Sequence, residues 1–369
     1  MSSKILFILH LPPPIHGAAM MGKYIQESEL VNSSFDCFCI NLATAGSLSD
    51  IGHISLKKLL KYFFLLKHIS HVVREIRPEL VYITPNAGGK AFFKDFIVVQ
   101  MLKSMGCKVI AHYHNKGVSV YQSKWVYNFF YKRFFSNLKV ILLAENLYKD
   151  IAKYVKREDV YICPNGISNS CKEELEARRN NELSHLLFLS NLLISKGINV
   201  LLDALKILKE RGYTFVCQYV GGETSEMGAV QFSEEVDKRG LNDRVAYVGR
   251  KVGEEKNAFF QQADVFVFPT YYYNECFPLV ILEAMEYKLP AISTNEGGIP
   301  DMVKDGENGL ICEKQNPVSL ADCIAKLLDD EELRVKMGSA GHEKFCREFT
   351  LDKFENRMRD ILNQNLFSS

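Results

Sequence analysis

Short apolar runs alternate with longer amphipathic stretches along the 369-residue chain. Val, Ile, Leu and Phe fill the runs with little polar alternation, which is typical of parallel strands that are buried on both faces. The stretches between the runs are long enough for crossover helices. The pattern predicts an α/β fold with doubly wound parallel sheets. In the first half of the chain, the predicted strands are at residues 4–11, 35–40, 80–83, 107–112, 139–144 and 160–163.

The alternation stops once and then begins again. Residues 168–184 are charged and polar, have no apolar stripe and follow the turn Pro164-Asn165-Gly166. Such a composition is typical of a linker, so we expect two Rossmann-like α/β domains of similar size. The predicted parts are an N-terminal domain at 1–167, the linker at 168–184, a C-terminal domain at 185–347 and a last helix at 348–369. The strands expected in the C-terminal domain are at 186–189, 214–220, 245–248, 265–268 and 291–293, before a hairpin-like turn at 305–309.

Composition narrows the class of protein. The formal net charge of +1 gives no global attraction to nucleic acid, so no nucleic-acid partner is expected. The ten cysteines are dilute and none lies in a C-x-x-C pair, which predicts reduced thiols in a cytoplasmic protein and no zinc site. The first apolar run is short and ends at prolines, as expected of a buried strand rather than a signal peptide. The chain contains no run of about 18 apolar residues, which is the length needed to span a membrane.

One predicted helix, at residues 56–77, is strongly basic. Its sequence LKKLLKYFFLLKHISHVVREIR interleaves lysines and arginines with apolar residues and holds one acid. Such a pattern can mark a helix that lies on an anionic membrane. A helix that packs on the sheet and exposes a solvated basic face explains it as well. Both interpretations stay open at this point.

The stretch PTYYYNECFPLVILE, residues 269–283, organises the C-terminal domain. It follows a predicted strand and leads into a helix, an order that presents backbone N–H groups to a phosphate. Pro278 fits the first helical position, which would leave the amides of Leu279 and Val280 for an anion. Glu283 is a carboxylate in an apolar run and needs a partner. A ribose diol would be a suitable one, because a carboxylate can accept two hydroxyl bonds.

Neighbouring loops add a cation and further backbone amides. Lys196 offers a point charge for phosphate, and Gly197 and Gly249 offer exposed amides. Glu275 precedes the helix and so lies on the far side of the phosphate from a ribose held by Glu283. Each residue alone has an ordinary structural explanation. Together they predict a site for a nucleotide diphosphate that carries a polar group such as a sugar.

The N-terminal domain offers weaker signals. Gly17 follows the first strand at a turn where a ligand could approach the backbone, although a plain tight turn explains it equally well. His112 and His114 lie at alternate positions where the strand at 107–112 ends, which is where open α/β sheets bind ligands. We expect His114, rather than His112, to contact a substrate. A third side chain that would complete a metal site is not visible.

The spacing of Glu275 and Glu283 completes a recognisable signature. Seven residues separate them in ECFPLVILE, and AMEYKLPAISTNEGGIPDMVKDGENGLI follows. This segment resembles the signature of the GT4 family of retaining glycosyltransferases, which have the GT-B fold. The turn at Pro164-Asn165-Gly166 and the pair Lys196-Gly197 are similar to further motifs of that family. The resemblance covers nearly the whole chain, is most specific over residues 264–311 and is thinner in the N-terminal half, where the family usually binds the acceptor.

The resemblance implies roles for particular residues. Glu275 would bind the donor sugar, Glu283 the ribose and Lys196 the leaving diphosphate. His114 is similar to the family's histidine near the donor sugar, so the resemblance assigns catalysis to Glu275, His114 and Lys196. It also implies that the last helix crosses back onto the N-terminal domain. The remaining donor-binding positions it implies are Gly17, Asn191, Gly249, Arg250, Phe277, Leu279 and Val280.

One position departs from the family pattern. The family usually has an arginine five residues before the lysine, and this chain has Asn191 there. Diphosphate stabilisation would then depend on Lys196 and helix N-termini, with help from Arg250 or Lys251. No D-x-D motif occurs, so we expect no cofactor and no divalent metal.

Three functions follow from these features. The preferred one is retaining transfer of a sugar from a nucleotide-diphosphate sugar to a saccharide acceptor. The family's frequent work in surface-polysaccharide assembly, such as O-antigen or capsule, suggests a lipid-linked acceptor at the inner face of the cytoplasmic membrane. A non-hydrolysing nucleotide-sugar epimerase shares the fold. A catalytically silent nucleotide-binding scaffold subunit also stays open because of Asn191, whereas a nicotinamide dehydrogenase is disfavoured because no G-x-G-x-x-G follows a strand.

Overall fold

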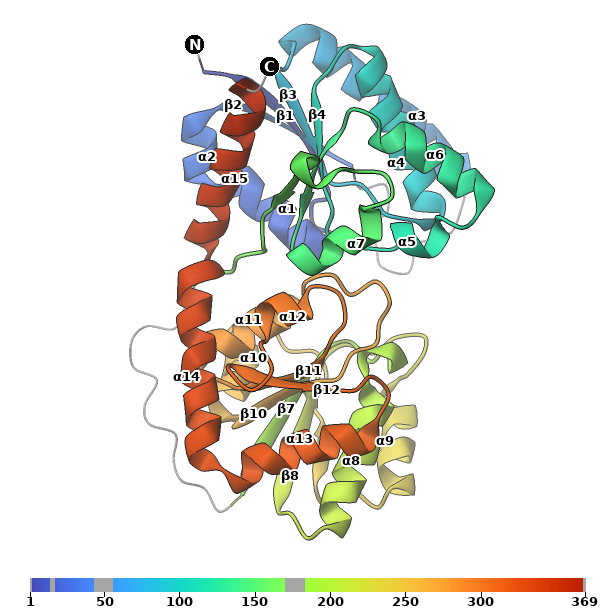
Figure 1. The fold of residues 1–369 in the computed structure, drawn as a ribbon. Coiled ribbons are helices and arrows are strands. Elements are labelled where there is room, and N and C mark those ends of the chain that lie inside the picture. The colour runs from blue at the N-terminus through green and yellow to red at the C-terminus, as the bar shows by residue number, and fades with distance from the viewer. Residues whose placement is uncertain (1, 14–16, 43–55, 170–182, 368–369) are drawn as a thin grey trace. The chain divides into compact units, whose positions relative to one another are not determined.

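The computed structural model describes residues 2–13, 17–42, 56–169 and 183–367 (Figure 1). The chain forms two compact units, each described here by itself. Unit 1 comprises Met1–Asn165 and Asp352–Ser369, and unit 2 comprises Gly166–Leu351. Most of the predicted linker, residues 170–182, lies outside the described residues.

Unit 1 is built on a parallel six-stranded sheet in the order β2-β1-β3-β4-β5-β6. Its strands lie where the apolar runs predict them. The central residues of β1, β3, β4 and β5 are buried, whereas those of the edge strands β2 and β6 are partly exposed. β1 pairs in register with β2 on one side and with β3 on the other. The strands are β1 (Lys4–Leu9), β2 (Asp36–Asn41), β3 (Leu80–Ile83), β4 (Val109–His112), β5 (Lys139–Leu142) and β6 (Val160–Ile162).

Helices cover both faces of this sheet. The connections from β2 to β3, β4 and β5 step in one direction, so right-handed crossovers put their helices on one face. Accordingly α3, α4 and α6 lie together, while α2 and the last helix, α15, lie on the other side (Figure 1). The helices are α1 (Gly17–Glu27), α2 (Glu29–Ser34), α3 (Leu56–Ile76), α4 (Gly89–Ser104), α5 (Val118–Tyr121), α6 (Trp125–Phe135), α7 (Tyr148–Ile151) and α15 (Leu351–Phe367).

The last helix is bound to unit 1 by contacts between distant parts of the chain. Lys108 Nζ donates to the carbonyl oxygen of Asn365 at 2.7 Å. Phe354, Met358 and Leu362 are fully buried at one helical face. Burial of that apolar stripe holds α15 in place.

Unit 2 has a second parallel six-stranded sheet, in the order β12-β11-β10-β7-β8-β9. Five of its strands are predicted from the sequence, and one is not. The strands are β7 (Ser184–Leu189), β8 (Phe215–Val220), β9 (Val245–Tyr247), β10 (Val265–Phe268), β11 (Ala291–Thr294) and β12 (Gly309–Cys312).

The prediction of a hairpin-like turn at 305–309 is wrong. The turn instead leads into β12, which pairs in parallel with β11 and forms the edge of the sheet. β12 begins at Gly309, where a Cβ atom would lie 2.3 Å from the carbonyl oxygen of Ala291. Gly309 is needed for close backbone packing, but in the sequence a glycine at this place is read as the end of a turn, so the strand was not predicted.

The helices of unit 2 form two layers around its sheet. α8 and α13 pack together, and α11 packs with α14. Within the described ranges, none of the helices is both long and apolar enough to cross a bilayer. The helices are α8 (Ile198–Glu210), α9 (Ala229–Lys238), α10 (Gly253–Gln262), α11 (Leu279–Glu286), α12 (Ile299–Met302), α13 (Pro317–Asp329) and α14 (Glu331–Glu348).

The strand order in unit 2 identifies where a ligand would bind. β7 lies between β8 and β10. The strands β8 and β9 are added on one side of β7, and β10, β11 and β12 are added on the other, so the order of the strands reverses at β7. In open parallel sheets, the crevice beyond the carboxyl ends of such neighbouring strands is the usual ligand site. The loops that follow β7 and β10 carry Lys196 and Glu275.

Candidate functional site

Lys196 and Glu275 form an ion pair at this switch point of the second sheet. Lys196 ends the short 3₁₀ helix η4 (Ile194–Lys196), and its Nζ lies 2.5 Å from Glu275 Oε2. Their side chains are only 14% and 10% exposed. The Lys196 ammonium also lies 4.6 Å from the centre of the Tyr272 ring. The pair therefore sits in a nearly dry setting, where charges act strongly on a ligand.

Glycines bring the loops of this site close together. Gly197 has a φ of 93°, and a Cβ atom there would lie 2.3 Å from the carbonyl oxygen of Pro269. The N–H of Tyr271 donates to the carbonyl oxygen of Ser195 at 2.9 Å. The loops after β7 and β10 are thus joined on either side of Lys196.

The loop after β11 is joined to the same place. Gly297 has a φ of 57°, and a Cβ atom on it would lie 2.2 Å from the carbonyl oxygen of Glu275. The next N–H, that of Gly298, donates to the carbonyl oxygen of Cys276 at 2.7 Å. The backbone of Glu275 is therefore fixed by two neighbouring loops.

Asn191 and Arg250, both predicted to bind the donor, come from neighbouring loops. Asn191 Oδ1 accepts the N–H of Gly222 at 3.2 Å, and the N–H of Gly221 donates to the carbonyl oxygen of Gly249 at 3.0 Å. Arg250 is exposed beside Gly222. Lys251, the other cation considered, instead pairs with Glu255 at 3.3 Å. Arg250 is thus the better placed of the two to replace the charge that Asn191 lacks.

The start of α11 corrects one expectation. Pro278 is the N-cap residue and not the first helical residue, and α11 begins at Leu279. The amides of Leu279 and Val280 have no intrahelical acceptor, as at the start of any helix, and no side chain of the described residues caps this end. The ring of Phe277 is buried against Phe349, which leaves only the Phe277 backbone for a ligand.

Glu283 has a partner that sequence reasoning missed. Its Oε1 accepts a hydrogen bond from Lys256 Nζ, on α10, at 2.8 Å. Its Oε2 is buried and has no hydrogen-bond partner among the residues that the structure describes. Burial raises the pKa of Glu283, and Lys256 opposes that rise. Because α10 precedes α11 by a whole strand and loop, no local pattern could have revealed the contact.

Lys256→Met is expected to make the protein less stable by about 2 kcal/mol near neutral pH, because an ionised Glu283 loses its hydrogen bond to the Lys256 ammonium. A buried acid whose pKa is raised destabilises the fold once it ionises, so stability falls as pH rises through that pKa. Lys256→Met raises the pKa of Glu283 further. The stability gap to the unmodified protein should therefore widen with rising pH, as measured by urea unfolding.

Lys251→Met is the matched control. It removes a lysine from an exposed pair with Glu255, and such pairs contribute little to stability. A stability gap of the same size and pH dependence in both variants would contradict the role of Lys256.

In unit 1, the rings of His112 and His114 lie against each other at the end of β4, tilted by 42°. Their ring centres are 4.2 Å apart. His112 is fully buried, and its Nδ1 is hydrogen-bonded to the Tyr82 hydroxyl at 2.6 Å. Burial, together with the nearby His114, lowers the pKa of His112 well below its usual value. His112 therefore supports the neighbouring ring. His114 is less buried than His112, but both of its ring nitrogens are buried, so its contact with a substrate stays a prediction.

A buried carboxylate fixes the loop that carries His114. Asp150 accepts the backbone N–H groups of Gly117, Val118 and Ser119 at 2.9, 3.1 and 2.9 Å. No sequence motif marks Asp150, since it comes from α7, some thirty residues further along the chain. Gly17 is the first residue of α1. How Gly17 and His114 relate to unit 2 stays a prediction.

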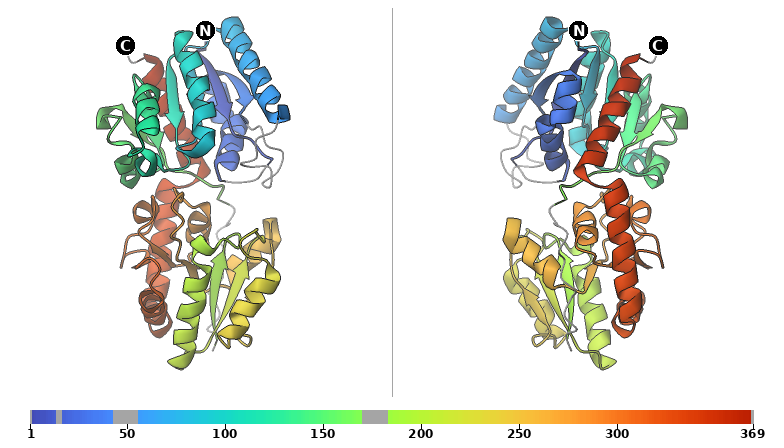
Figure 2. Two further views of the ribbon diagram at one scale, coloured as in Figure 1. Left: turned by 90° about the vertical axis from the view of Figure 1, so that its right-hand side faces the viewer. Right: turned by 90° about the vertical axis from the view of Figure 1, so that its left-hand side faces the viewer.

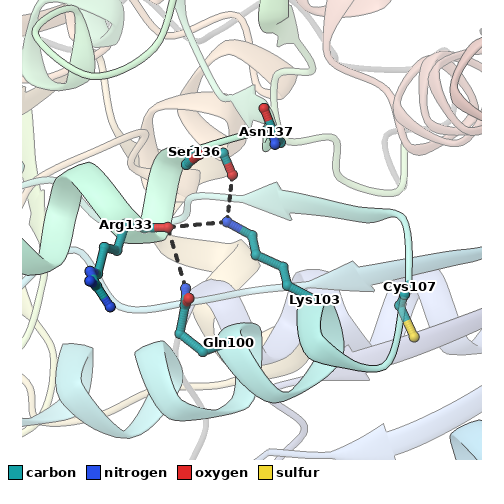
Figure 3. A pocket seen from close by; sticks show the side chains of 7 residues that line it. Gln100, Lys103, Cys107, Arg133, Ser136 and Asn137 are labelled. Atoms are coloured by element: carbon teal, nitrogen blue, oxygen red, sulfur yellow. Dashed lines mark hydrogen bonds between the residues drawn. The ribbon is translucent and has the colours of Figure 1, made fainter.

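A depression of about 450 Å³ lies elsewhere on unit 1, at the amino ends of β4 and β5 (Figure 3). Lys103 Nζ donates there to the carbonyl oxygens of Phe134 and Ser136 at 2.7 and 2.6 Å, which closes the end of α6. Burial lowers the pKa of Lys103 to about 8. The depression contains none of the predicted site residues. In the described part of the chain, no three His, Cys, Asp or Glu side chains gather as they would around a metal ion.

Known proteins are similar to this chain in sequence. Residues 171–344 match the model of a family described as glycosyl transferases group 1. The capsular polysaccharide biosynthesis glycosyltransferase CapM of Staphylococcus aureus is 29% identical over 243 residues, which are 62% of each chain. The D-inositol 3-phosphate glycosyltransferase of Corynebacterium diphtheriae is 33% identical over 159 residues, 42% of this chain and 37% of that protein. The matched part of this chain spans less than two thirds of either relative.

Solved structures show the same fold. Sucrose-phosphate synthase from Thermosynechococcus elongatus has a TM-score of 0.77 at 19% identity, with all of both chains covered. HepE of Anabaena, solved in complex with UDP and glucose, has a TM-score of 0.70 at 15% identity, with 98% of this chain and 100% of that chain covered. These likenesses confirm the predicted GT-B fold of two parallel-sheet units. The match to the group 1 family of glycosyltransferases covers residues 171–344, which lie in unit 2.

Proposed function

We propose that this protein is a retaining glycosyltransferase that moves a sugar from a nucleotide-diphosphate sugar to a saccharide acceptor. The Lys196–Glu275 pair carries this proposal. It places a cation for phosphate and a carboxylate for sugar hydroxyls side by side at the ligand-binding edge of the second sheet. The family match and the glycosyltransferases among the relatives support the proposal.

In this scheme, the donor takes over both halves of the ion pair. The diphosphate binds to Lys196 and to the amides at the start of α11, since cations and helix N-termini both attract phosphate. The sugar hydroxyls donate to Glu275. The ribose hydroxyls donate to Glu283, whose Oε2 has no other partner in the described residues. Arg250 supplies charge beside Asn191.

Transfer then proceeds with retention of configuration. Lys196 and the α11 amides stabilise the charge that develops on the departing diphosphate, so no divalent metal is required in the scheme. We propose that a departing phosphate oxygen takes the acceptor proton as the sugar passes through an oxocarbenium-like state. Chelation with EDTA is expected to leave turnover unchanged.

The acceptor is proposed to be a lipid-linked saccharide in the assembly of a bacterial surface polysaccharide. CapM is named for capsular polysaccharide biosynthesis, and a lipopolysaccharide outer core galactosyltransferase shares the fold at a TM-score of 0.73. Such an acceptor would place the protein in the cytoplasm, at the inner face of the membrane, with peripheral contact through the helix at 56–77.

A thermal-shift panel tests the donor site. Nucleoside diphosphates and nucleotide sugars are compared, and those with the right base should raise the melting temperature by mass action, the sugar forms most. Lys196→Met should abolish the rise in melting temperature. Lys206→Met, which changes an exposed lysine of α8, should leave that rise unchanged. A protein that no nucleotide stabilises would overturn the proposal.

Product analysis separates the remaining alternatives. An epimerase would convert the sugar of the bound nucleotide without any acceptor. A silent scaffold would bind nucleotide and turn over no acceptor. Transfer to a saccharide with retained anomeric configuration is the result that the proposed function requires.

A further inference from the structure

Exposed apolar side chains gather on one face of unit 1. They come from the three neighbouring helices α3, α4 and α6 and from the short helix α5, which precedes α6. Trp125, on α6, is the most exposed at 80%, and Phe64, on α3, is 64% exposed. We call this surface the α3–α6 face. Its exposed apolar side chains are Leu60, Phe63, Phe64, Ile97, Val120, Trp125 and Phe129.

The helices of this face form one continuous layer. α3 packs on α4, α4 packs on α6 and α5 packs on α6. Side chains join them beneath the surface, since Phe96 of α4 meets Phe130 of α6 with ring centres 4.8 Å apart. Figure 2 (left) shows this layer turned toward the viewer. The exposed apolar residues therefore share one surface and are not scattered singly over the molecule.

The same part of the chain carries a strong positive charge. Residues 56–144 contain 15 Lys and Arg but 3 Asp and Glu, in a chain whose formal net charge is only +1. One of those acids, Asp95, is buried, and another, Glu75, lies 3.5 Å from His71. From residue 96 to residue 144 there is no acidic residue. Some of these cations lie off the face, since Lys139 pairs with Asp159 and Lys108 donates to Asn365. The face is still basic, because exposed cations lie on its helices or at the start of α6, namely Lys61, Lys67, Lys124, Lys132 and Arg133.

Cations and aromatic rings are interleaved on this surface. Lys67 Nζ lies 4.6 Å from the ring centre of Phe63, and the Arg133 guanidinium lies 4.9 Å from that of Phe129. The buried centre of a protein–protein interface is usually depleted of lysine. Lysine and arginine beside Trp, Phe and Leu are instead typical of surfaces that lie in the headgroup region of a bilayer.

We propose that the α3–α6 face docks on an anionic lipid bilayer. Trp125, Phe129 and Phe64 would enter the headgroup region, while neighbouring lysines reach the lipid phosphates. Long basic side chains can do so and still cover apolar surface with their stems. The proposal rests on the proposed function for its purpose, since it would bring the enzyme to a lipid-linked acceptor. It also extends the predicted contact from one helix, whose Lys57 and Lys58 side chains lie outside the described residues, to four.

Trp125 is the only tryptophan of the chain, so its fluorescence reports on this face alone. The full-length protein is mixed with vesicles of phosphatidylcholine, with or without about a third phosphatidylglycerol. We expect a blue shift of the emission, quenching by lipids brominated near the headgroup, and cosedimentation with the anionic vesicles only. About 0.5 M salt should weaken the binding, because it screens surface charges.

Matched variants test the face itself. Lys67→Glu/Lys124→Glu/Lys132→Glu should lower the partition coefficient at least about tenfold, as each cation near an anionic surface contributes to binding. Phe64→Ser/Phe129→Ser should lower it as well. The controls Lys206→Glu/Lys336→Glu and Val230→Ser/Val335→Ser alter exposed residues of unit 2 and should change nothing.

Each other outcome contradicts the proposal. Absence of partitioning, equal loss in face and control variants, or a self-associated protein that ignores vesicles would each overturn it. Nucleotide-induced thermal shifts are measured on the same variants without lipid. If the unmodified protein binds nucleotide but not anionic vesicles, this inference alone fails. If it binds vesicles but no nucleotide stabilises it, the proposed function alone fails.

Discussion

Glu275→Ala is expected to lower kcat/KM for sugar transfer by about 10³-fold, a typical loss when a charged group that stabilises the reacting centre is removed. The carboxylate is the group proposed to hold the sugar hydroxyls, and it is nearly buried beside Lys196. Nucleoside diphosphate, which lacks the sugar, should bind at least as tightly as to the unmodified protein, because Lys196 no longer has a competing partner. Steady-state kinetics and calorimetric titration measure the two effects.

The same substitution has a structural effect that must be separated from the catalytic one. Removing one partner of a mostly buried ion pair leaves the other charge uncompensated, at a cost of about 2–4 kcal/mol. Glu275→Gln/Lys196→Met replaces both charges and should recover most of that stability without recovering transfer. Near-normal turnover in Glu275→Ala would remove this residue from the mechanism.

Gly197→Ala is expected to destabilise unit 2 by about 2–4 kcal/mol and to slow transfer about 100-fold. A Cβ atom there would lie 2.3 Å from the carbonyl oxygen of Pro269, which belongs to backbone and cannot swing aside. The loops after β7 and β10 would have to separate, and Lys196 would move with them. Small displacements of a positioned group cost rate on this scale. Urea unfolding and kinetics with the identified donor provide the measurements.

Gly212→Ala separates crowding from backbone strain. Gly212 has a φ of 88°, close to the 93° of Gly197, yet nothing lies within 4 Å of its Cβ position. We expect it to cost only about 1 kcal/mol, the typical penalty for a strained backbone angle, and to leave transfer unaffected. Equal effects of the two substitutions would show that close loop packing at Gly197 is unimportant.

The sequence predicted those parts of the protein that local patterns determine. The apolar runs located eleven of the twelve strands, because a buried parallel strand needs a nearly continuous apolar segment. The relation between Glu275 and Glu283 could be predicted, since one precedes and the other follows the start of the same helix, so that local sequence determines their spacing. β12 was not predicted, because it is an edge strand that begins at a close-packed glycine, and such a glycine is also typical of a turn.

Contacts between distant segments could not be predicted in this way. Lys196 and Glu275 are 79 positions apart, and Lys256 and Glu283 are 27 apart. Each pair depends on which strands become neighbours, and strand order is not encoded in local periodicity. The sequence predicts that Lys196, Glu275 and Glu283 bind a ligand, but it gives no sign that Lys196 and Glu275 form an ion pair with each other.

The meeting of Lys196 and Glu275 has a consequence for turnover. In the empty site the two charges cancel, so a lone phosphate or a free sugar would satisfy one group while stranding the other in a nearly dry environment. Only a molecule that joins phosphate to sugar compensates both. Once the sugar has left, the carboxylate is again without a partner and competes with the remaining diphosphate for the ammonium. On the proposed function, the enzyme thereby favours intact donor over spent nucleotide, and re-formation of the ion pair helps to expel the product.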